Sequence, residues 1–440
     1  CGVFGLACDA VGRLRLDSFD MTEPHVQIRS DVDDSAVTDN AVSVVGLSAM
    51  GMGELGATAV AVLRDADVIL GSWRQLNLLS DDITAERRPW PSPMLPALNR
   101  IFGELSGKKI AVLASGDPMF HGIGSTLRRK FPHMSIVVYP HVSSASLACA
   151  RLGWAVNRTG VYSLVNQVVE SLVLPIEAGQ PFLVLGRDDK TPMEICQLLV
   201  SMGQPDARVE ILNDLGSKVE AHSVGSAAQP PQVVSVLNVI AVVPQQQGWA
   251  RTPGLPDSAF SHDGQLTKSH IRALTVAALA PREGETLWDI GGGAGSVAIE
   301  CLRATNTGKA VCFEADEIRR GRILKNARKL GVAHRLAVQG AAPDNYTSVP
   351  DNPDVIFIGG GLTMLGVFAD AWNRLKVGGR MVINAVTIES EQQLWQLKQR
   401  YGGELVRLSV AKEHRIGSFA AFQPALPVTQ WVATKQPTAT

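Results

Sequence analysis

The segment Asp289-Ile-Gly-Gly-Gly-Ala-Gly295 constrains this chain more than any other. It lies between an apolar run expected to form a strand (285–291) and a stretch with helical periodicity (296–304). Glycines let the backbone turn sharply and approach a ligand, and the helix that follows offers unpaired N–H groups. Glu314 ends the next expected strand, at the spacing of an acid that binds a ribose diol. This part of the chain is therefore expected to bind a nucleotide.

The acid at the start of the loop helps to identify the ligand. Glu314 suits NAD and S-adenosylmethionine (SAM) equally, but D-x-G-x-G-x-G is the form found in methyltransferases. It fits a ligand that carries a cationic amino group and no pyrophosphate. The turn Leu375-Lys-Val-Gly-Gly-Arg380 before a strand is also typical of class I SAM methyltransferases. The predicted cofactor-binding residues here are Asp289, Gly291, Gly293, Gly295 and Glu314.

The rest of the second half alternates between strand and helix patterns, which predicts a doubly wound, mostly parallel, Rossmann-like sheet. Strands are expected at 285–291, 310–316, 335–340, 354–360 and 379–386, and helices at 266–280, 296–304, 317–330, 362–375 and 389–401.

The first half carries a glycine-rich site of another kind. An apolar run (41–47) leads into a loop with Gly46 and Gly51, and a later strand (109–115) leads into Gly116-Asp117-Pro118. Such a loop alone is common in turns. The order of these two loops along the chain resembles that of the tetrapyrrole methylase fold, which class III SAM methyltransferases adopt. That resemblance implies a second SAM site at Gly46, Gly51, Gly116, Asp117, Pro118, Ser143 and Ser144, with His121 as a candidate for a substrate role.

The change of pattern between the halves gives the expected domains. Residues 1–40 are an extension of unknown role, 41–244 the tetrapyrrole methylase domain, 245–258 a linker rich in Gln, Pro and Gly, 259–432 the class I methyltransferase domain and 433–440 a tail.

The pairing of these two folds resembles the precorrin-6Y C5,15-methyltransferases (decarboxylating) of cobalamin biosynthesis. The resemblance covers about residues 41–432 and is most specific at 115–124, 143–154, 261–275, 288–300, 383–391 and 424–431. It implies methylation of precorrin-6Y at carbon 5 by the first half. It assigns methylation at carbon 15 and decarboxylation of the ring C acetate to the second, giving precorrin-8X. One SAM site in each half and no metal are implied.

Orienting the acetate and supplying a proton require polar groups in the second half. Candidates are His262, Asp263 and Lys268, with ordinary capping or surface roles as the alternative for each. The substrate carries many carboxylates, which arginine and lysine bind through charge-assisted hydrogen bonds. Arg151, Arg158, Lys268 and Arg272 are candidates for that role.

The sequence departs from the family pattern at two loops. The family has Gly-Asp-Ala-Pro after the third strand of the second half, where the acid suits the adenine amine, whereas this chain has Gly340-Ala341-Ala342-Pro343. We therefore expect weaker SAM binding in this half. Ser48 and Met50 replace residues of the first loop, where the family more often has Gly-x-Gly and an acid, and they weaken the case for that site.

Composition limits the partners. A formal net charge of -1 without basic runs speaks against nucleic acid, and no long apolar stretch or secretory signal is present. We expect a cytoplasmic enzyme, and the resemblance implies a homo-oligomer. Two alternatives stay open: a SAM-dependent methyltransferase of another substrate, such as RNA or another tetrapyrrole, and a chain in which one half is a non-catalytic SAM-binding scaffold.

Overall fold

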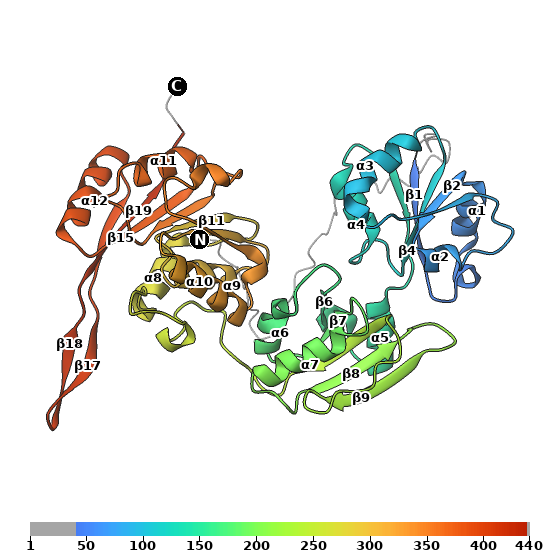
Figure 1. Cartoon of the computed structure of the whole chain (residues 1–440), viewed down its shortest axis with the longest axis horizontal. Helices are drawn as coiled ribbons and strands as arrows, with labels where there is room; N and C mark the ends of the chain where they lie inside the picture. The colour runs from blue at the N-terminus through green and yellow to red at the C-terminus, as the bar shows by residue number, and fades with distance from the viewer. Residues whose placement is uncertain (1–40, 438–440) are drawn as a thin grey trace, which may run out of the picture.

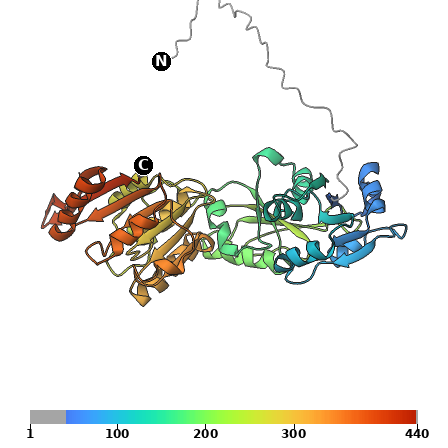
Figure 2. The same ribbon diagram turned by 90° about the horizontal axis from the view of Figure 1, so that it is seen from above.

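The structure, a computed structural model, describes residues 41–437. The predicted extension (1–40) and the last residues of the predicted tail lie outside that range. Figure 1 shows two α/β units at the ends of the molecule, with a separate sheet between them. The same order is visible from above in Figure 2. Of the helices in the described range, none is both long and apolar enough to span a membrane.

The first unit is a five-stranded parallel sheet of order β3-β2-β4-β1-β5. Its strands are β1 (Val42–Leu47), β2 (Val68–Gly71), β3 (Glu86–Pro89), β4 (Ile110–Ser115) and β5 (Ile136–Tyr139). Its helices are α1 (Ala57–Asp65), α2 (Trp73–Leu76), α3 (Met94–Glu104) and α4 (Ile123–Lys130), whereas α5 (Ser144–Leu152), which follows β5, packs against the second sheet. Because β4, β1 and β5 are neighbours, the loops at their carboxyl ends meet at one edge.

The second sheet has the order β6-β7-β10-β8-β9 and is mostly antiparallel. Its elements are β6 (Gly160–Ser163), α6 (Val173–Glu177), β7 (Phe182–Leu185), α7 (Thr191–Ser201), β8 (Arg208–Asn213), β9 (Ala221–Ser226) and β10 (Asn238–Val243). β3, β6 and β9 have no clear strand pattern in the sequence. All three lie at sheet edges with partly exposed side chains, so they lack the continuous apolar run of the central strands.

The third sheet confirms the Rossmann-like prediction. Its order is β13-β12-β11-β14-β15-β19-β16, with five parallel strands followed by β19, which is antiparallel to both of its neighbours, β15 and β16. The strands are β11 (Thr286–Ile290), β12 (Lys309–Phe313), β13 (Leu336–Gln339), β14 (Val355–Ile358), β15 (Arg380–Ala385), β16 (Glu404–Leu408) and β19 (Val428–Thr434). The helices are α8 (Ser269–Leu279), α9 (Ser296–Ala304), α10 (Glu317–Lys329), α11 (Val367–Arg374) and α12 (Ile388–Tyr401).

Two helices begin later than the sequence suggests. The helix expected at 266–280 starts at Ser269 because Lys268 has extended backbone dihedrals. The helix expected at 362–375 starts after Gly366, whose φ of 84° is left-handed. The residues before each start become loops, and both loops contribute to the cavity described below.

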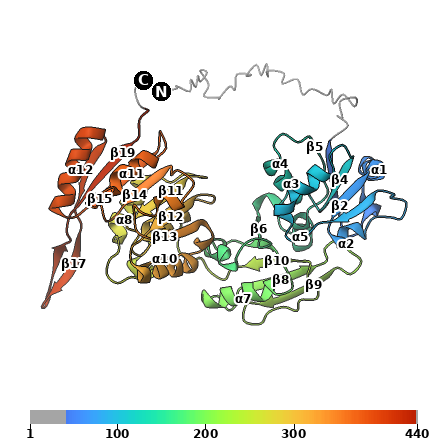
Figure 3. The ribbon, with the colours of Figure 1, turned by 45° about the horizontal axis from the view of Figure 1, so that its top comes forward.

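A β-hairpin extends away from the third sheet, as Figure 3 shows at the β17 label. It consists of β17 (Ala411–Ile416) paired with β18 (Phe419–Pro424), and every one of its strand residues is exposed. The sequence analysis did not anticipate it.

The predicted linker forms hydrogen bonds to both halves of the chain. Gly248 N donates to Glu177 O at 2.9 Å, while Arg251 Nε donates to Arg303 O at 2.7 Å. Glu177 of α6 also forms a buried ion pair with Arg303 of α9, with 2.9 Å between Oε2 and Nη1. Residues 245–258 are therefore part of the contact between the halves.

Candidate functional site

The glycine loop after β11 passes close to the loop after β14. Gly291 has a φ of +72°, and a Cβ at this position would lie 2.8 Å from Gly360 N. Gly295, also left-handed, is the N-cap of α9. A side chain at Gly291 would therefore push two neighbouring loops apart.

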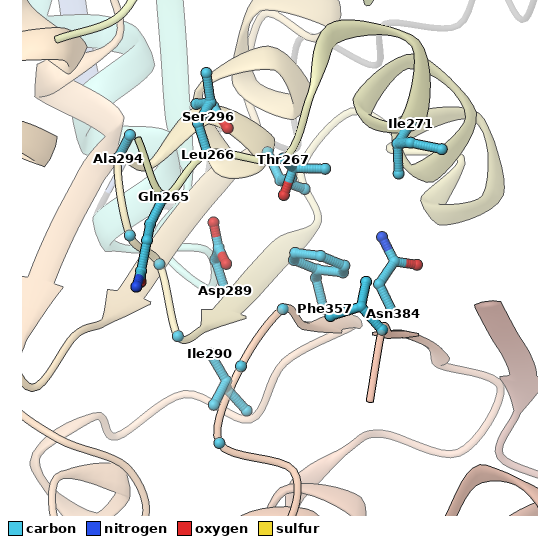
Figure 4. A pocket seen from close by; sticks show the side chains of 18 of the residues that line it. Gln265, Leu266, Thr267, Ile271, Asp289, Ile290, Ala294, Ser296, Phe357 and Asn384 are labelled. Carbon is cyan, nitrogen blue, oxygen red and sulfur yellow. The ribbon is translucent and has the colours of Figure 1, made fainter. Parts of the chain in front are cut away.

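Asp289 is the most unusual acid of this site. It is 1 % exposed, Ala298 N donates to its Oδ2 at 3.2 Å, and its Oδ1 has no partner. Burial is the main reason why its pKa is raised to about 7. Figure 4 shows the carboxyl group near the centre of a cavity. A buried acceptor without a partner suits a cationic donor such as an amino group.

Glu314 lies at the carboxyl end of β12 and is 6 % exposed. Gly293 N donates to its Oε2 at 2.7 Å, and Asp316 N donates to its Oε1 at 3.0 Å. Each carboxylate oxygen keeps acceptor capacity, and Glu314 lines the same cavity. The two acids are thus placed to bind different ends of one ligand.

The cavity has a volume of about 790 Å³, within the usual range for a site that holds a small molecule. Cationic side chains lie on its wall at Lys268, Arg319 and Lys412. Its lining also includes exposed apolar side chains, Met364, Val386 and Leu426. The site therefore suits a ligand with a broad apolar body and negatively charged groups.

The predicted cofactor residues are largely brought together here. Asp289, Gly291, Gly293, Glu314 and Ala341 line the cavity. Gly295 caps the adjoining helix, and Gly340 immediately precedes Ala341 without being among the lining residues.

The three proposed acid or base residues have different environments. Lys268 lines the cavity, with its Nζ 3.8 Å from an Asp257 carboxylate oxygen. Asp263 is bound by Arg319 and Arg322 at 2.9 and 2.7 Å, and these arginines hold the pKa of its carboxyl well below the usual range. His262 Nδ1 accepts from Gly264 N at 3.0 Å. Neither His262 nor Asp263 is among the residues that line the cavity.

One predicted carboxylate partner takes a structural role instead. Arg272 is fully buried, donates to Glu300 at 2.6 Å and lies over the Phe260 ring. Its hydrogen-bonding capacity is used inside the domain, so the expectation that it contacts substrate was wrong. Arg151 is exposed and pairs with Glu220 at 2.6 Å, and Arg158 is exposed.

Several lining residues were missed by the sequence analysis, namely Gln265, Thr267, His270, Arg319, Asn384 and Lys412. They come from separate segments, so no local spacing brings them together. The available signal was the family resemblance, because Gln265, Thr267 and His270 fall within 261–275 and Asn384 falls within 383–391.

The first half builds its site from three touching loops. A Cβ on Gly46 would lie 2.3 Å from Gly116 O and 2.9 Å from His141 N. A Cβ on Gly116, whose φ is +61°, would lie 3.1 Å from Val142 O. The loops after β1, β4 and β5 therefore meet as the strand order requires, and backbone forms much of the surface between them.

The other predicted residues of this half stabilise the loops. Asp117 Oδ1 accepts from Met119 N at 2.8 Å, and Ser143 caps α5 by accepting from Ser146 N at 3.0 Å. Gly51 has a φ of +69° and packs against Leu78 O. His121 is exposed, has a φ of 53° and contacts the Phe120 ring. Pro118 follows Asp117 in the same loop, and Ser144 is the first residue of α5.

Arg74 was not predicted to belong to this site. Its Nη2 donates to Ser115 Oγ at 2.8 Å, one residue before Gly116. The side chain is exposed, yet desolvation lowers its pKa, and Asp214 of the second sheet partly opposes this shift. Asp214 itself has a strained φ of 47°. These features place a cation between the end of β4 and Asp214, which follows β8 of the second sheet.

Within residues 41–437, no cluster of three or more His, Cys, Asp or Glu side chains is arranged to hold a metal ion.

Two protein families match the chain, one in each half. "Tetrapyrrole (Corrin/Porphyrin) Methylases" matches residues 41–230, and "Precorrin methyltransferase domain" matches residues 258–435. A precorrin-6Y C(5,15)-methyltransferase [decarboxylating] of Mycobacterium tuberculosis is 45% identical over 90% of this chain and 100% of its own length. The chain belongs to the precorrin-6Y C5,15-methyltransferase (decarboxylating) family.

A second relative also matches over nearly its whole length. The Sinorhizobium sp protein of the same name is 39% identical over 91% of this chain and 98% of its own length. A crystal structure of the C-terminal domain of the Rhodobacter capsulatus precorrin-6Y C5,15-methyltransferase is 44% identical. It covers 42% of this chain and 100% of that chain, with a TM-score of 0.40.

Proposed function

We propose that this protein methylates precorrin-6Y at carbons 5 and 15 and removes carbon dioxide from the ring C acetate, giving precorrin-8X in cobalamin biosynthesis. The observation that carries the proposal is 39–45% identity to decarboxylating precorrin-6Y C5,15-methyltransferases over nearly the whole length of both chains. The first half acts at carbon 5, and the second half acts at carbon 15 and on the acetate.

Each half holds one SAM molecule. In the second half, Asp289 accepts from the amino group, Glu314 accepts from the ribose hydroxyls and the wall at Ala341 faces the adenine. The support is the unpartnered Asp289 Oδ1 and the position of all three residues on one cavity. In the first half, the loops at Gly46, Gly116 and Ser143 bind SAM mainly through their backbone, since most of the atoms nearest to a Cβ at Gly46 or Gly116 belong to the backbone.

When bound, SAM supplies an electrophilic methyl group. A reduced tetrapyrrole is rich in enamine carbons, so the chain's residues chiefly align a meso carbon with that methyl group and exclude water. For decarboxylation, the C–C bond to the acetate carboxyl breaks and its electrons enter the conjugated macrocycle. A proton is then added at the carbon left behind. Lys268, His270 and Lys412 are titratable donors on the cavity wall that can supply this proton.

Substrate carboxylates are bound at both sites by cations. Lys268, Arg319 and Lys412 serve the second half, and Arg74 serves the first. The exposed apolar side chains at Met364, Val386 and Leu426 face the macrocycle.

The decisive experiment incubates the purified chain with precorrin-6Y and isotopically labelled SAM. We expect gain of two methyl groups and loss of one carbon dioxide by mass, with the labelled carbons assigned by NMR. A product with one methyl group would mean that one half is a non-catalytic scaffold. Unchanged precorrin-6Y under conditions in which a known family member converts it would contradict the proposed activity.

The active form is a homo-oligomer in the cytoplasm. Support comes from the β17–β18 hairpin, where Ile416, Phe419 and Phe422 are 63%, 79% and 77% exposed. An isolated two-stranded hairpin is only marginally stable in water, so we propose that a second copy covers it. Light scattering of the wild type and of a Phe419→Ser/Phe422→Ser variant tests this. A monomeric wild type would contradict it.

A further inference from the structure

Three segments that carry the family resemblance place polar side chains at one point beside the C-terminal cavity. Thr275 lies on α8, Asn384 at the end of β15 and Gln430 on β19. Thr275 and Gln430 are 0% and 4% exposed, whereas Asn384 is half-buried and lines the cavity. Asn384 and Gln430 are direct cross-strand partners. None of the three has a part in the binding roles described above.

The hydrogen bonds among these residues can have only one direction. Thr275 Oγ1 donates its single proton to Ile271 O at 2.8 Å, so it must accept its other bonds. Asn384 Nδ2 donates to it at 2.9 Å, and Gln430 Nε2 donates to it at 3.3 Å. Gln430 Nε2 also donates to Asn384 Oδ1 at 2.9 Å. The carbonyl group of a helix residue therefore fixes which way the Asn384 amide faces.

Counting protons shows what this network leaves available. Gln430 Nε2 has two protons, and both are used, one by Thr275 and one by Asn384. Asn384 Nδ2 has two, of which Thr275 takes one. One N–H of Asn384 is left, on the residue of the three that lines the cavity. Figure 4 shows Asn384 beside Phe357, below the helix that carries Ile271.

The sheet order separates this donor from the cofactor residues. Glu314 follows β12 and Asp289 lies on β11, while β14 and then β15 continue the sheet on the other side. Asn384 is thus three strands away from the strand that leads to Glu314. A ligand held by Asp289 and Glu314 leaves Asn384 on the side where the reacting substrate lies.

We propose that Asn384 donates its free amide N–H to a carboxylate oxygen of the substrate acetate in the second half. In this proposal, which rests on the proposed function, Thr275 and Gln430 are positioning residues. A neutral donor suits this task, because a cation would stabilise the carboxylate more strongly and oppose loss of carbon dioxide. The amide orients the acetate and leaves the bond-breaking electrons to the macrocycle.

Asn384→Asp in the full-length chain is the direct test, since it keeps the shape and removes the donor. We expect carbon-15 methylation and decarboxylation to fall about 30-fold in kcat/KM, the cost of a hydrogen bond to a charged group. Carbon-5 methylation and a SAM stoichiometry equal to that of the wild type should persist in the same sample and report a folded chain. Wild-type decarboxylation by Asn384→Asp would overturn the inference.

A matched pair of Thr275 variants tests the positioning role. Thr275→Val removes the acceptor and should lower the same two activities about 5-fold through KM, whereas Thr275→Ser restores the acceptor and should restore both. Equal activity of the two variants would contradict the positioning role. If Asn384→Asp does not fold, this pair of Thr275 variants still tests the inference. If the wild type itself leaves precorrin-6Y unchanged, the proposed function fails first, so the two failures are distinct.

Discussion

The two halves of this protein present their ligand sites in contrasting ways. In the second half, side chains dominate: a buried acid at Asp289, an acid at Glu314 and a cavity of about 790 Å³. In the first half, backbone dominates, since the loops at Gly46, Gly116 and Ser143 touch one another directly. In the proposed function, the same cofactor is bound by side-chain charges in one half and by a backbone surface in the other, so the two sites should fail in different ways.

The largest effect should come from adding a Cβ that blocks one site at a time. Gly46→Ala places a Cβ 2.3 Å from Gly116 O, and Gly291→Ala places one 2.8 Å from Gly360 N at a left-handed φ. Because backbone must move in both cases, we expect at least about 100-fold loss of carbon-5 methylation in the first variant. The second should lose carbon-15 methylation and decarboxylation to the same extent. Calorimetry should find SAM stoichiometry reduced from two per chain to one in each.

Matched controls exist in both halves. Gly103→Ala in α3 and Gly321→Ala in α10 add a Cβ where no atom lies within 4 Å, so both variants should behave as wild type. If Gly46→Ala still bound two SAM molecules, the backbone-built site in the first half would be wrong. If Gly291→Ala still bound two SAM molecules, the proposed site in the second half would likewise be wrong.

The same contrast explains what could be predicted from sequence. The helix expected at 296–304 is α9 (Ser296–Ala304), and the loop before it is where the motif put it, because strand, glycine loop and helix are local patterns. Arg74 and Asn384 could not be found this way. Each reaches its site from a separate segment, and only the order of the strands brings it there. The hairpin was missed because its strands bury nothing in this chain.

A smaller loss should follow removal of the cation at Arg74 in the first half. Arg74→Met keeps the aliphatic stem and removes the guanidinium beside Ser115. We expect KM for precorrin-6Y in carbon-5 methylation to rise about 20-fold, since one charge-assisted hydrogen bond to a carboxylate is lost. Steady-state kinetics of the first methylation measures it. Arg64→Met, which removes an exposed ion pair with Asp82, is the control, and an equal effect of both variants would refute a specific role for Arg74.

The buried acid makes the second site dependent on pH. Because the pKa of Asp289 is raised to about 7, the carboxyl must lose a proton before it can pair with a SAM amino group. Affinity of this site should therefore rise as the pH increases, about 10-fold per pH unit below 7, and level off above it. Calorimetry in the Gly46→Ala background isolates this site. Asp289→Asn should remove the dependence, and a flat wild-type profile would contradict the role of Asp289.

The same acid also affects the stability of the ligand-free chain. Its folded-state pKa of about 7 lies above 3.8, the ordinary value for an aspartate, so the folded chain holds a proton that the unfolded chain releases between these values. Stability should fall as pH rises through this window, by roughly 4 kcal/mol at most. Thermal unfolding of wild type and Asp289→Asn from pH 4 to pH 8 should show a decline that is smaller in the variant.

The smallest effect should come from restoring the acid that this chain lacks. Ala341 lines the cavity on the side where the family pattern has an aspartate suited to the adenine amine. Ala341→Asp should tighten SAM binding in the second half about 5-fold, in line with one added hydrogen bond from a partly exposed amine. Ala341→Asn adds similar volume without the charge and should gain less. Titration in the Gly46→Ala background measures both, and unchanged affinity in Ala341→Asp would mean that Asp289 and Glu314 already bind the cofactor without help from this loop.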